Sequence, residues 1–174
     1  MCGIFGTIAW PNGPKRATLG VVERILSTTA HRGPDDRGIY AEGSHGGWSD
    51  RDPHNSFPSS PHLVLAHRRL SILDLTIAGH QPMASADGRF HIVFNGEIYN
   101  FRDLRSDLVA AGHSFVSDSD TEVLLQGYVE WGENVLDRVN GMFAFAIWDR
   151  KERALFIARD RLGIKPFYYH LTNG

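Results

Sequence analysis

The order of strand-like and helix-like segments limits the fold more than any other feature of this sequence. Apolar, β-prone segments stand near both ends of the chain: GIFGTIAW at 3–10, and the pair MFAFAIWD and ALFIARD around the turn RKER. Two further strand candidates occupy residues 63–75 and 90–99. A parallel sheet would require strands and helices to alternate along the chain. We therefore expect sheets that are covered by helices, which is an α+β fold.

Amphipathic helices are predicted between these strands from the spacing of apolar residues and from capping residues. Asn100 precedes one helix, which Gly112 ends, and Ser119 with Glu122 forms a capping-box pattern before the next. The other two predicted helices are 17–30 and a short one near 133–139. Residues 41–62 are rich in Gly, Ser, Pro and Asp and are interpreted as a surface loop.

The composition argues against several classes of protein. Hydrophobic residues make up 42% and aromatic residues 11% of the 174, which is enough for a folded core, and the length suits one domain. With a net charge of −2 and no basic stripe, nucleic acid is not an expected partner. No apolar run approaches the length of a membrane span, so we expect no membrane-spanning segment. The single cysteine cannot form an internal disulfide, which fits a reducing cytoplasm.

Cys2, the only cysteine, directly follows the initiator methionine. Removal of Met1 would leave a thiol and a free α-amine on one residue. An unperturbed thiol has a pKa of about 8.5 and an α-amine one of about 7.7–8.0, so the amine is partly neutral near pH 7 and can accept the thiol proton. One residue would then supply both nucleophile and general base. Two alternatives stay open: a small apolar residue that begins a buried strand, and an acylated N-terminus, for which no second lipid signal is present.

Arg68 and Arg69 lie inside an apolar strand pattern, HRRLSILD. Strand alternation makes them point to opposite faces, so one can be solvated while the other enters a site. A guanidinium binds a carboxylate through two hydrogen bonds, as the α-carboxylate of a small amino acid would require. A surface ion pair is the alternative, and alternation does not choose between the two arginines.

The segment FNGEIYN places Asn95, Gly96 and Glu97 at the end of a strand pattern. The Asn side-chain amide and the Gly N–H, which no Cβ shields, could together form an oxyanion hole. Asn-Gly is also the dipeptide most typical of a two-residue hairpin turn. Taken alone, this pattern favours the turn.

The segment SDSDTE brings Asp118, Asp120 and Glu122 to the start of a helix, where acidic residues are favourable in any case. The functional alternative is that one carboxylate binds a substrate ammonium group, so that Arg at one end and acids at the other fit a zwitterion. The nine histidines form no tight ligand pair such as HExxH, and no second cysteine is present, so we expect no metal site.

Eight sequence blocks in a fixed order carry a family resemblance. They are MCGIFG, HRGPDDRG, LAHRRLSILD, GHQPM, FNGEIYNFRDLR, SDTEVLLQGY, GMFAFAIWD and RDRLGIKPFYY. Over nearly the whole chain they resemble the glutaminase domain of glutamine-hydrolysing asparagine synthetases, which are class II glutamine amidotransferases. HRGPD followed by RRLSILD is similar to the asparagine synthetase branch.

The resemblance implies an N-terminal nucleophile hydrolase fold, a four-layer αββα sandwich with two antiparallel sheets. It implies that Cys2 attacks the side-chain amide of glutamine, that ammonia leaves, and that water hydrolyses the thioester to glutamate. By the family pattern, Asn95 and Gly96 form the oxyanion hole. The implied substrate-binding residues are Arg69 for the α-carboxylate, the backbone of Leu70, Ser71, Ile72 and Leu73, and Glu97 and Asp120 around the α-amine.

The chain departs from this family at three points. The loop at 41–62 is longer than the family pattern predicts. No SGGxDS pyrophosphate loop is present, and SHGGWSD lacks its order. The chain also ends at HLTNG, which predicts a C-terminally truncated glutaminase domain. We therefore expect no cofactor for this domain, and we assign ATP and Mg²⁺ to a synthetase domain that this chain lacks.

Three hypotheses about function follow. The first is glutamine hydrolysis that feeds ammonia to a synthetase domain of the parent polypeptide, for ATP-dependent amidation of aspartate. The second is an amidotransferase domain that serves another carboxylate acceptor, and the third is a folded but inactive binding module. The expected partners are glutamine, the synthetase domain and a second copy in a homodimer.

Overall fold

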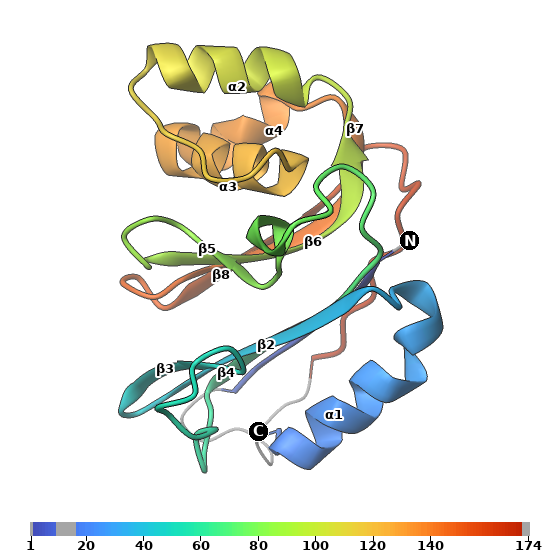
Figure 1. Ribbon diagram of the computed structural model, residues 1–174, viewed down its shortest axis with the longest axis vertical. Helices are drawn as coiled ribbons and strands as arrows, with labels where there is room; N and C mark the ends of the chain where they lie inside the picture. The colour runs from blue at the N-terminus through green and yellow to red at the C-terminus, as the bar shows by residue number, and fades with distance from the viewer. Residues whose placement is uncertain (1, 10–16, 172–174) are drawn as a thin grey trace.

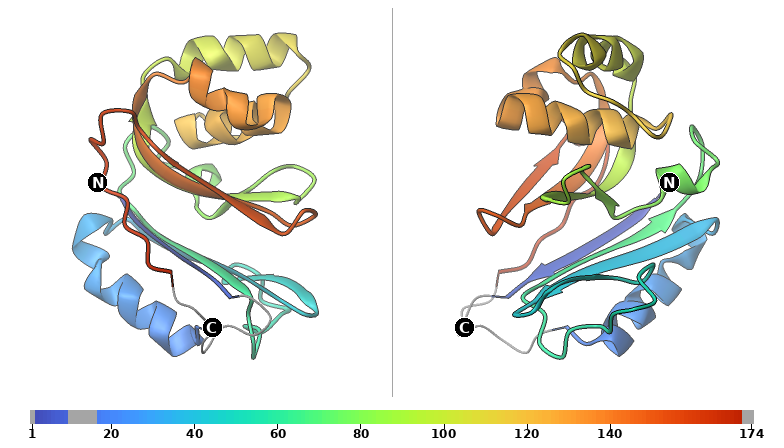
Figure 2. Two further views of the ribbon diagram at one scale, coloured as in Figure 1. Left: turned by 180° about the vertical axis from the view of Figure 1, so that it is seen from behind. Right: turned by 60° about the vertical axis from the view of Figure 1, so that its left-hand side comes forward.

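The computed structural model describes residues 2–9 and 17–171, so Met1 and the end of the strand expected at 3–10 lie outside the described residues. Two four-stranded sheets with antiparallel pairing stack on each other, and helices cover the outer face of each sheet (Figure 1). The views in Figure 2 show one helix alone on one outer face and the other helices together on the opposite face. The four layers confirm the predicted αββα sandwich.

The first sheet has the strand order β1-β4-β2-β3. Its strands are β1 (Gly3–Ile8), β2 (Asp36–Gly43), β3 (Gly46–Ser49) and β4 (Leu63–Arg69). Helix α1 (Leu19–Thr28), followed by the short 3-10 helix η1 (Ala30–Arg32), covers its outer face. Val22 and Leu26 of α1 pack there against Ile39, Val64 and Ala66, because alternate residues of β2 and β4 point to that side.

The second sheet has the strand order β5-β6-β7-β8. Its strands are β5 (Met83–Ala84), β6 (Phe90–Ile98), β7 (Gly141–Asp149) and β8 (Ala154–Arg159). The helices over its outer face are α2 (Phe101–Ala110), α3 (Asp120–Trp131) and α4 (Val135–Arg138), with the 3-10 helices η2 (Ile77–Gly79) and η3 (Gly132–Asn134) in the connections. Leu108, Leu124 and Leu125 are buried against Ile92 and Phe145, which makes this the larger core.

A third apolar cluster fills the space between the two sheets. Leu63 and Leu65 of β4 meet Val93 of β6 and Trp148 of β7 there. The odd-numbered residues of β4 and β6 therefore face the neighbouring sheet. This alternation decides which side chains reach the inter-sheet space farther along the same strands.

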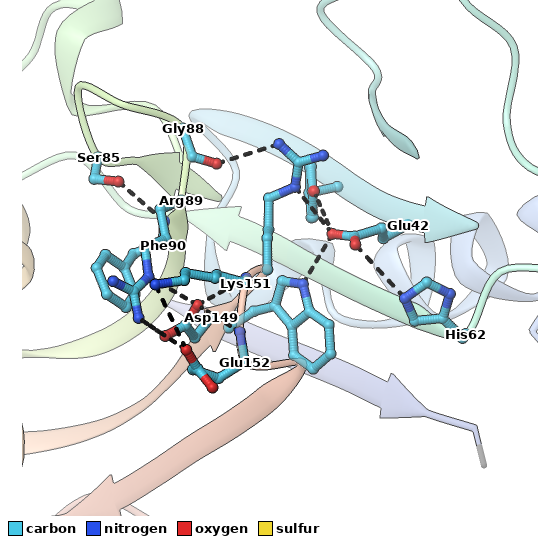
Figure 3. Close-up of polar contacts among 12 residues, drawn as sticks. Glu42, His62, Ser85, Gly88, Arg89, Phe90, Asp149, Lys151 and Glu152 are labelled. Carbon is cyan, nitrogen blue, oxygen red and sulfur yellow. Dashed lines mark hydrogen bonds and ion pairs between the residues drawn. The ribbon is translucent and has the colours of Figure 1, made fainter. Parts of the chain in front are cut away.

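A buried carboxylate joins the sheets at one end of this space. Glu42 of β2 accepts hydrogen bonds from the Tyr40 hydroxyl at 2.8 Å, from Nε1 of Trp148 at 2.9 Å and from Nε of Arg150 at 3.2 Å (Figure 3). Burial alone would raise the pKa of Glu42, but these donors lower it below its ordinary value. These contacts tie the two sheets together at this end of the inter-sheet space.

Most predicted elements are confirmed, but the predictions for residues 41–62 and 63–75 were wrong. The loop expected at 41–62 contains the end of β2 and all of β3, which pair around Gly43 and Gly46. Their Gly- and Ser-rich composition hides the strands, which long-range pairing with β4 stabilises. The strand expected at 63–75 ends at Arg69. Of the helices in the described part of the chain, none combines the length and apolar character that crossing a membrane requires.

Candidate active site

A pocket of about 140 Å³ lies at the end of the inter-sheet space opposite to Glu42. It is lined by all but one of the residues that the sequence predicts for the site. These are Cys2, Arg69, Leu70, Ile72, Leu73, Asn95, Gly96, Glu97 and Asp120. Ser71 does not line the pocket, and its backbone N–H donates instead to a carboxylate oxygen of Asp35 at 2.8 Å.

Cys2 lies just before β1, and its half-buried side chain faces the pocket. Its Sγ accepts a hydrogen bond from the backbone N–H of Leu70 at 3.4 Å. Its carbonyl oxygen accepts a hydrogen bond from Nε of Arg32 at 3.3 Å. The thiol is thus held between the starting end of β1 and the finishing end of β4.

Arg69 lines the pocket, whereas Arg68 lies on the opposite face of β4, the face on which Val64 and Ala66 pack against α1, so the predicted opposite orientation of the two arginines is confirmed. The guanidinium of Arg69 donates from Nη1 to the carbonyl of Thr76 at 3.0 Å and from Nη2 to the carbonyl of Asp74. A guanidinium has five N–H groups, so others remain for a ligand carboxylate. Arg69 therefore shapes the loop at 70–76 as well as the pocket.

The loop at 70–76 is fixed by a second group, the carboxylate of Asp74. It accepts hydrogen bonds from the hydroxyl of Thr76 at 2.6 Å, from the Thr76 N–H at 2.7 Å and from the N–H of Asp118 at 3.0 Å. The bond from the Thr76 hydroxyl contributes most to lowering the pKa of Asp74. These contacts join the loop to the segment before α3.

Asn95 and Gly96 lie inside β6, where they pair with Ala144 and Phe143 of β7. The prediction of a hairpin turn, which the Asn-Gly pattern alone favours, was therefore wrong. Gly96 is required by packing within the sheet, because a Cβ at this position would lie 2.3 Å from the carbonyl oxygen of Met142.

Alternation along β6 places one backbone donor at the pocket. The N–H of Phe94 donates to Oε1 of Gln81 at 2.7 Å, and the N–H of Ile98 donates to Oδ2 of Asp120 at 2.9 Å. Both N–H groups point away from β7, and in an antiparallel pair Gly96, between them, has the same orientation. Strand β5 pairs only with the first part of β6. The Gly96 N–H therefore faces the open edge that lines the pocket.

The Asn95 side chain stands on the inner face of β6 and is only 4% exposed. It lines the same pocket. Within residues 2–9 and 17–171, its amide makes no hydrogen bond to another side chain or to the backbone. Buried polar groups are normally hydrogen-bonded. The Asn95 amide can therefore donate a hydrogen bond to an oxygen atom of a ligand.

Asp120, in the first turn of α3, lines the pocket, and its pKa is raised, in contrast to that of Asp74. Burial raises its pKa to about 6, and the nearby charge of Glu97 acts in the same direction. The N–H groups of Ile98 and Thr121 oppose the shift. The carboxylate is therefore ionised at pH 7 but titrates close to neutrality.

The two acidic neighbours of Asp120 have structural partners. Asp118 is exposed and forms an ion pair with Arg105 at 3.3 Å. Glu122 accepts the backbone N–H groups of Val116 at 2.9 Å and Ser117 at 2.7 Å. The predicted capping box is thus half formed, since the Ser119 hydroxyl accepts the N–H of Glu122, but the Glu122 carboxylate does not return to Ser119.

Sequence reasoning missed several residues that line the pocket. They are Asp74, Gly79, Gln81, Phe94, Ser119, Thr121, Met142 and Lys165. Lys165 is only 5% exposed, and its backbone N–H is held by Asp160 at 2.9 Å. Gln81 belongs to the block GHQPM and Lys165 to the block RDRLGIKPFYY. Membership of these blocks was the sequence signal that could have identified both residues as part of the site. Among the described residues, no group of three or more His, Cys, Asp or Glu is arranged to hold a metal ion.

Comparison with known proteins places this chain in a family. A family model described as a glutamine amidotransferase domain matches residues 1–174. Asparagine synthetase [glutamine-hydrolyzing] 3 of Bacillus subtilis is 42% identical over 173 residues, which cover 97% of this chain and 25% of that protein. Asparagine synthetase [glutamine-hydrolyzing] 1 of the same organism is 38% identical over 174 residues, with 99% and 24% covered. The chain spans about a quarter of the length of these relatives.

The fold also resembles that of a solved enzyme. Glutamine phosphoribosylpyrophosphate amidotransferase from B. subtilis, complexed with ADP and GMP, superposes with a TM-score of 0.72 at 21% identity, over 94% of this chain and 38% of that one. This likeness shows the shared fold, while the family model covers the chain from end to end. The chain belongs to the glutamine amidotransferase domain family.

Proposed function

We propose that this domain hydrolyses the side-chain amide of glutamine with Cys2 as the nucleophile and supplies the ammonia to a synthetase domain of the same polypeptide, in the cytoplasm. The observation that carries the proposal is the pocket, which gathers a thiol, an arginine, three carboxylates and two amide donors that no described residue uses. Amidation of aspartate is the proposed use of the ammonia, because the two B. subtilis relatives described above are named asparagine synthetases.

The reaction begins once Met1 has been removed. The free α-amine of Cys2 takes the thiol proton, and Sγ attacks the amide carbon of glutamine to form a tetrahedral intermediate. Return of the proton to the amide nitrogen releases ammonia and leaves a thioester. Water then adds to the thioester carbon, the C–S bond breaks, and glutamate and the thiol of Cys2 are regenerated.

The oxyanion of the tetrahedral intermediate would be stabilised by the Gly96 N–H and the Asn95 side-chain amide. Both donors line the pocket, and both belong to a strand that pairing with β7 keeps rigid. Preorganised donors of this kind act where charge develops, and loss of one typically costs about 2.7–4 kcal/mol of transition-state stabilisation.

The charges around the pocket suit a zwitterionic amino acid. Arg69 would bind the α-carboxylate through the N–H groups that the loop carbonyls leave free, next to the backbone of Leu70–Leu73. Glu97 and Asp120 would bind the α-ammonium group. Because the pKa of Asp120 is about 6, its carboxylate is ionised at neutral pH, so its attraction to the ammonium is present there.

The test is glutamate release from L-glutamine by the full-length protein that carries this domain, with the N-terminal mass measured in the same sample. We expect equal amounts of glutamate and ammonia from the wild type, none from Cys2→Ala, and loss of Met1 in both. A variant with a bulky residue inserted between Met1 and Cys2 keeps the thiol but blocks the α-amine, and it should also be inactive. Undiminished hydrolysis by Cys2→Ala would overturn the proposal.

A further inference from the structure

The edge of β6 that faces the pocket is completed by side chains in place of a neighbouring strand. Beyond Ile92, β5 no longer pairs with β6. Over this stretch, Gln81 accepts the N–H of Phe94, and Nε2 of His67 lies 3.0 Å from the Phe94 carbonyl oxygen. Both polar groups of the Phe94 backbone are thus held, one residue before Asn95.

Gln81 is fixed at both its backbone and its side chain. It is only 4% exposed, and its Nε2 donates to the hydroxyl of Thr121 in α3 at 3.1 Å. The backbone of Gln81 also packs closely against β2, because a Cβ at Gly38 would lie 2.1 Å from the Gln81 carbonyl oxygen. The acceptor for the Phe94 N–H therefore has little freedom to move.

From these contacts we propose that Gln81 is a positioning residue that sets the orientation of the Gly96 N–H in the oxyanion hole. Gln81 and Asp120 occupy the N–H groups of Phe94 and Ile98, on either side of Gly96. Among the described residues, no side chain accepts the N–H of Gly96, which lies between them. The inference rests on the proposed glutamine hydrolysis, and it assigns Gln81 no contact with the substrate.

Removal of the Gln81 acceptor would leave the buried N–H of Phe94 without a partner. An unmade buried hydrogen bond is costly, so the strand edge would shift to recruit water or another acceptor. Gly96 is two residues away on the same edge, and a small displacement of an oxyanion donor lowers the rate of the chemical step much more than it lowers substrate binding.

The first variant is Gln81→Met, which keeps the length of the side chain but removes the acceptor. The matched control is Ser85→Ala, because the buried Ser85 hydroxyl accepts the N–H of Phe90, on the same edge of β6 but far from the pocket. We expect Gln81→Met to lower kcat for glutamate release at least tenfold with KM within twofold of wild type. Thr121→Val, which frees only the Gln81 amide, should lower kcat by a smaller factor.

For Ser85→Ala we expect kcat and KM within twofold of wild type. Backbone amide hydrogen exchange gives a readout that does not depend on hydrolysis: the Phe94 amide should exchange faster in Gln81→Met, and the Phe90 amide in Ser85→Ala. A Gln81→Met protein with wild-type kcat, with unchanged Phe94 exchange, or with a loss matched by Ser85→Ala would overturn the inference. A wild-type protein that releases no glutamate would instead refute the proposed function, while the exchange data would still test the role of Gln81.

Discussion

The Sγ atom of Cys2 lies 3.4 Å from the backbone nitrogen of Leu70, across 68 residues of sequence. This contact is a consequence of strand register, because Gly3 of β1 pairs with Arg68 of β4. In an antiparallel pair the start of one strand lies beside the end of the other. The same register that builds the sheet thus places a thiol beside the loop that lines the pocket.

Arg32 is expected to hold the Cys2 backbone in this position, since its Nε donates to the Cys2 carbonyl. We predict that Arg32→Met lowers kcat for glutamate release by about 10- to 100-fold, as expected when a reacting group is misplaced. Arg37→Met is the matched control, because it removes an equal charge from a surface ion pair with Glu23. Equal activity in the two variants, measured by steady-state kinetics, would contradict the prediction.

Gly96 tests the fit between β6 and β7. A Cβ at this position would lie 2.3 Å from the Met142 carbonyl oxygen, so Gly96→Ala must push the strands apart. We expect a loss of more than about 2 kcal/mol in the free energy of unfolding, together with loss of glutamate release. Denaturant titration measures the first quantity.

The control for Gly96→Ala is Gly20→Ala in α1, where a Cβ meets no atom within 4 Å. Alanine is a better helix former than glycine, so this variant should be equal to the wild type or up to about 1 kcal/mol more stable. If both variants unfolded at the same denaturant concentration, the close approach of β6 and β7 at Gly96 would make no contribution to the free energy of unfolding.

Asp120 gives a pH dependence with a defined sign. Its pKa is about 6 in the folded protein, against an ordinary value of 3.8, so the folded state binds the proton more tightly than the unfolded chain. Its contribution to stability therefore falls as the pH rises from about 4 to about 6, by about 3 kcal/mol in total. Asp120→Asn lacks this titration and can still accept the Ile98 N–H.

We therefore expect the stability of Asp120→Asn, relative to wild type, to increase across this pH window and to level off above about pH 7. Denaturant titrations of both proteins at pH 4.5, 5.5, 6.5 and 7.5 measure it. A stability difference that does not change with pH would mean that Asp120 titrates at its ordinary value.

The sequence predicted those parts of the fold and site that depend on local pattern. Apolar, β-prone segments predicted β6 and β7, and the spacing of apolar residues with capping patterns predicted α2 and α3, although the Asn100 side chain makes no capping hydrogen bond to α2. It failed where distant partners decide the structure. Asn95-Gly96 has the local pattern of a turn, but β7 extends alongside it and makes it part of a strand. Gln81 was missed because its role depends on Phe94 and Thr121, which are 13 and 40 residues away in the sequence and contact it only in the folded domain.

Glu42 lies at the opposite end of the inter-sheet space from Cys2. A substitution at Glu42 should therefore change the stability of the protein without changing its activity. Glu42→Gln would weaken the hydrogen bonds from Tyr40, Trp148 and Arg150, so we expect a loss of about 1–3 kcal/mol in unfolding free energy. The kcat and KM for glutamine should stay within twofold of wild type at a temperature where both proteins are folded. A large change in KM would show that the two ends are coupled.

The pH dependence of the Glu42→Gln effect has the opposite sign to that of Asp120. The pKa of folded Glu42 lies below its ordinary value of 4.5, so the unfolded chain binds the proton more tightly. The stability that Glu42 contributes is therefore fully present above the unfolded pKa and is lost as the pH falls through the folded pKa. Thermal unfolding at pH 7 and pH 3.5 should show the two proteins far apart at the higher pH and closer together at the lower one. If the gap widened in acid, the donors around Glu42 would not be stabilising its charge.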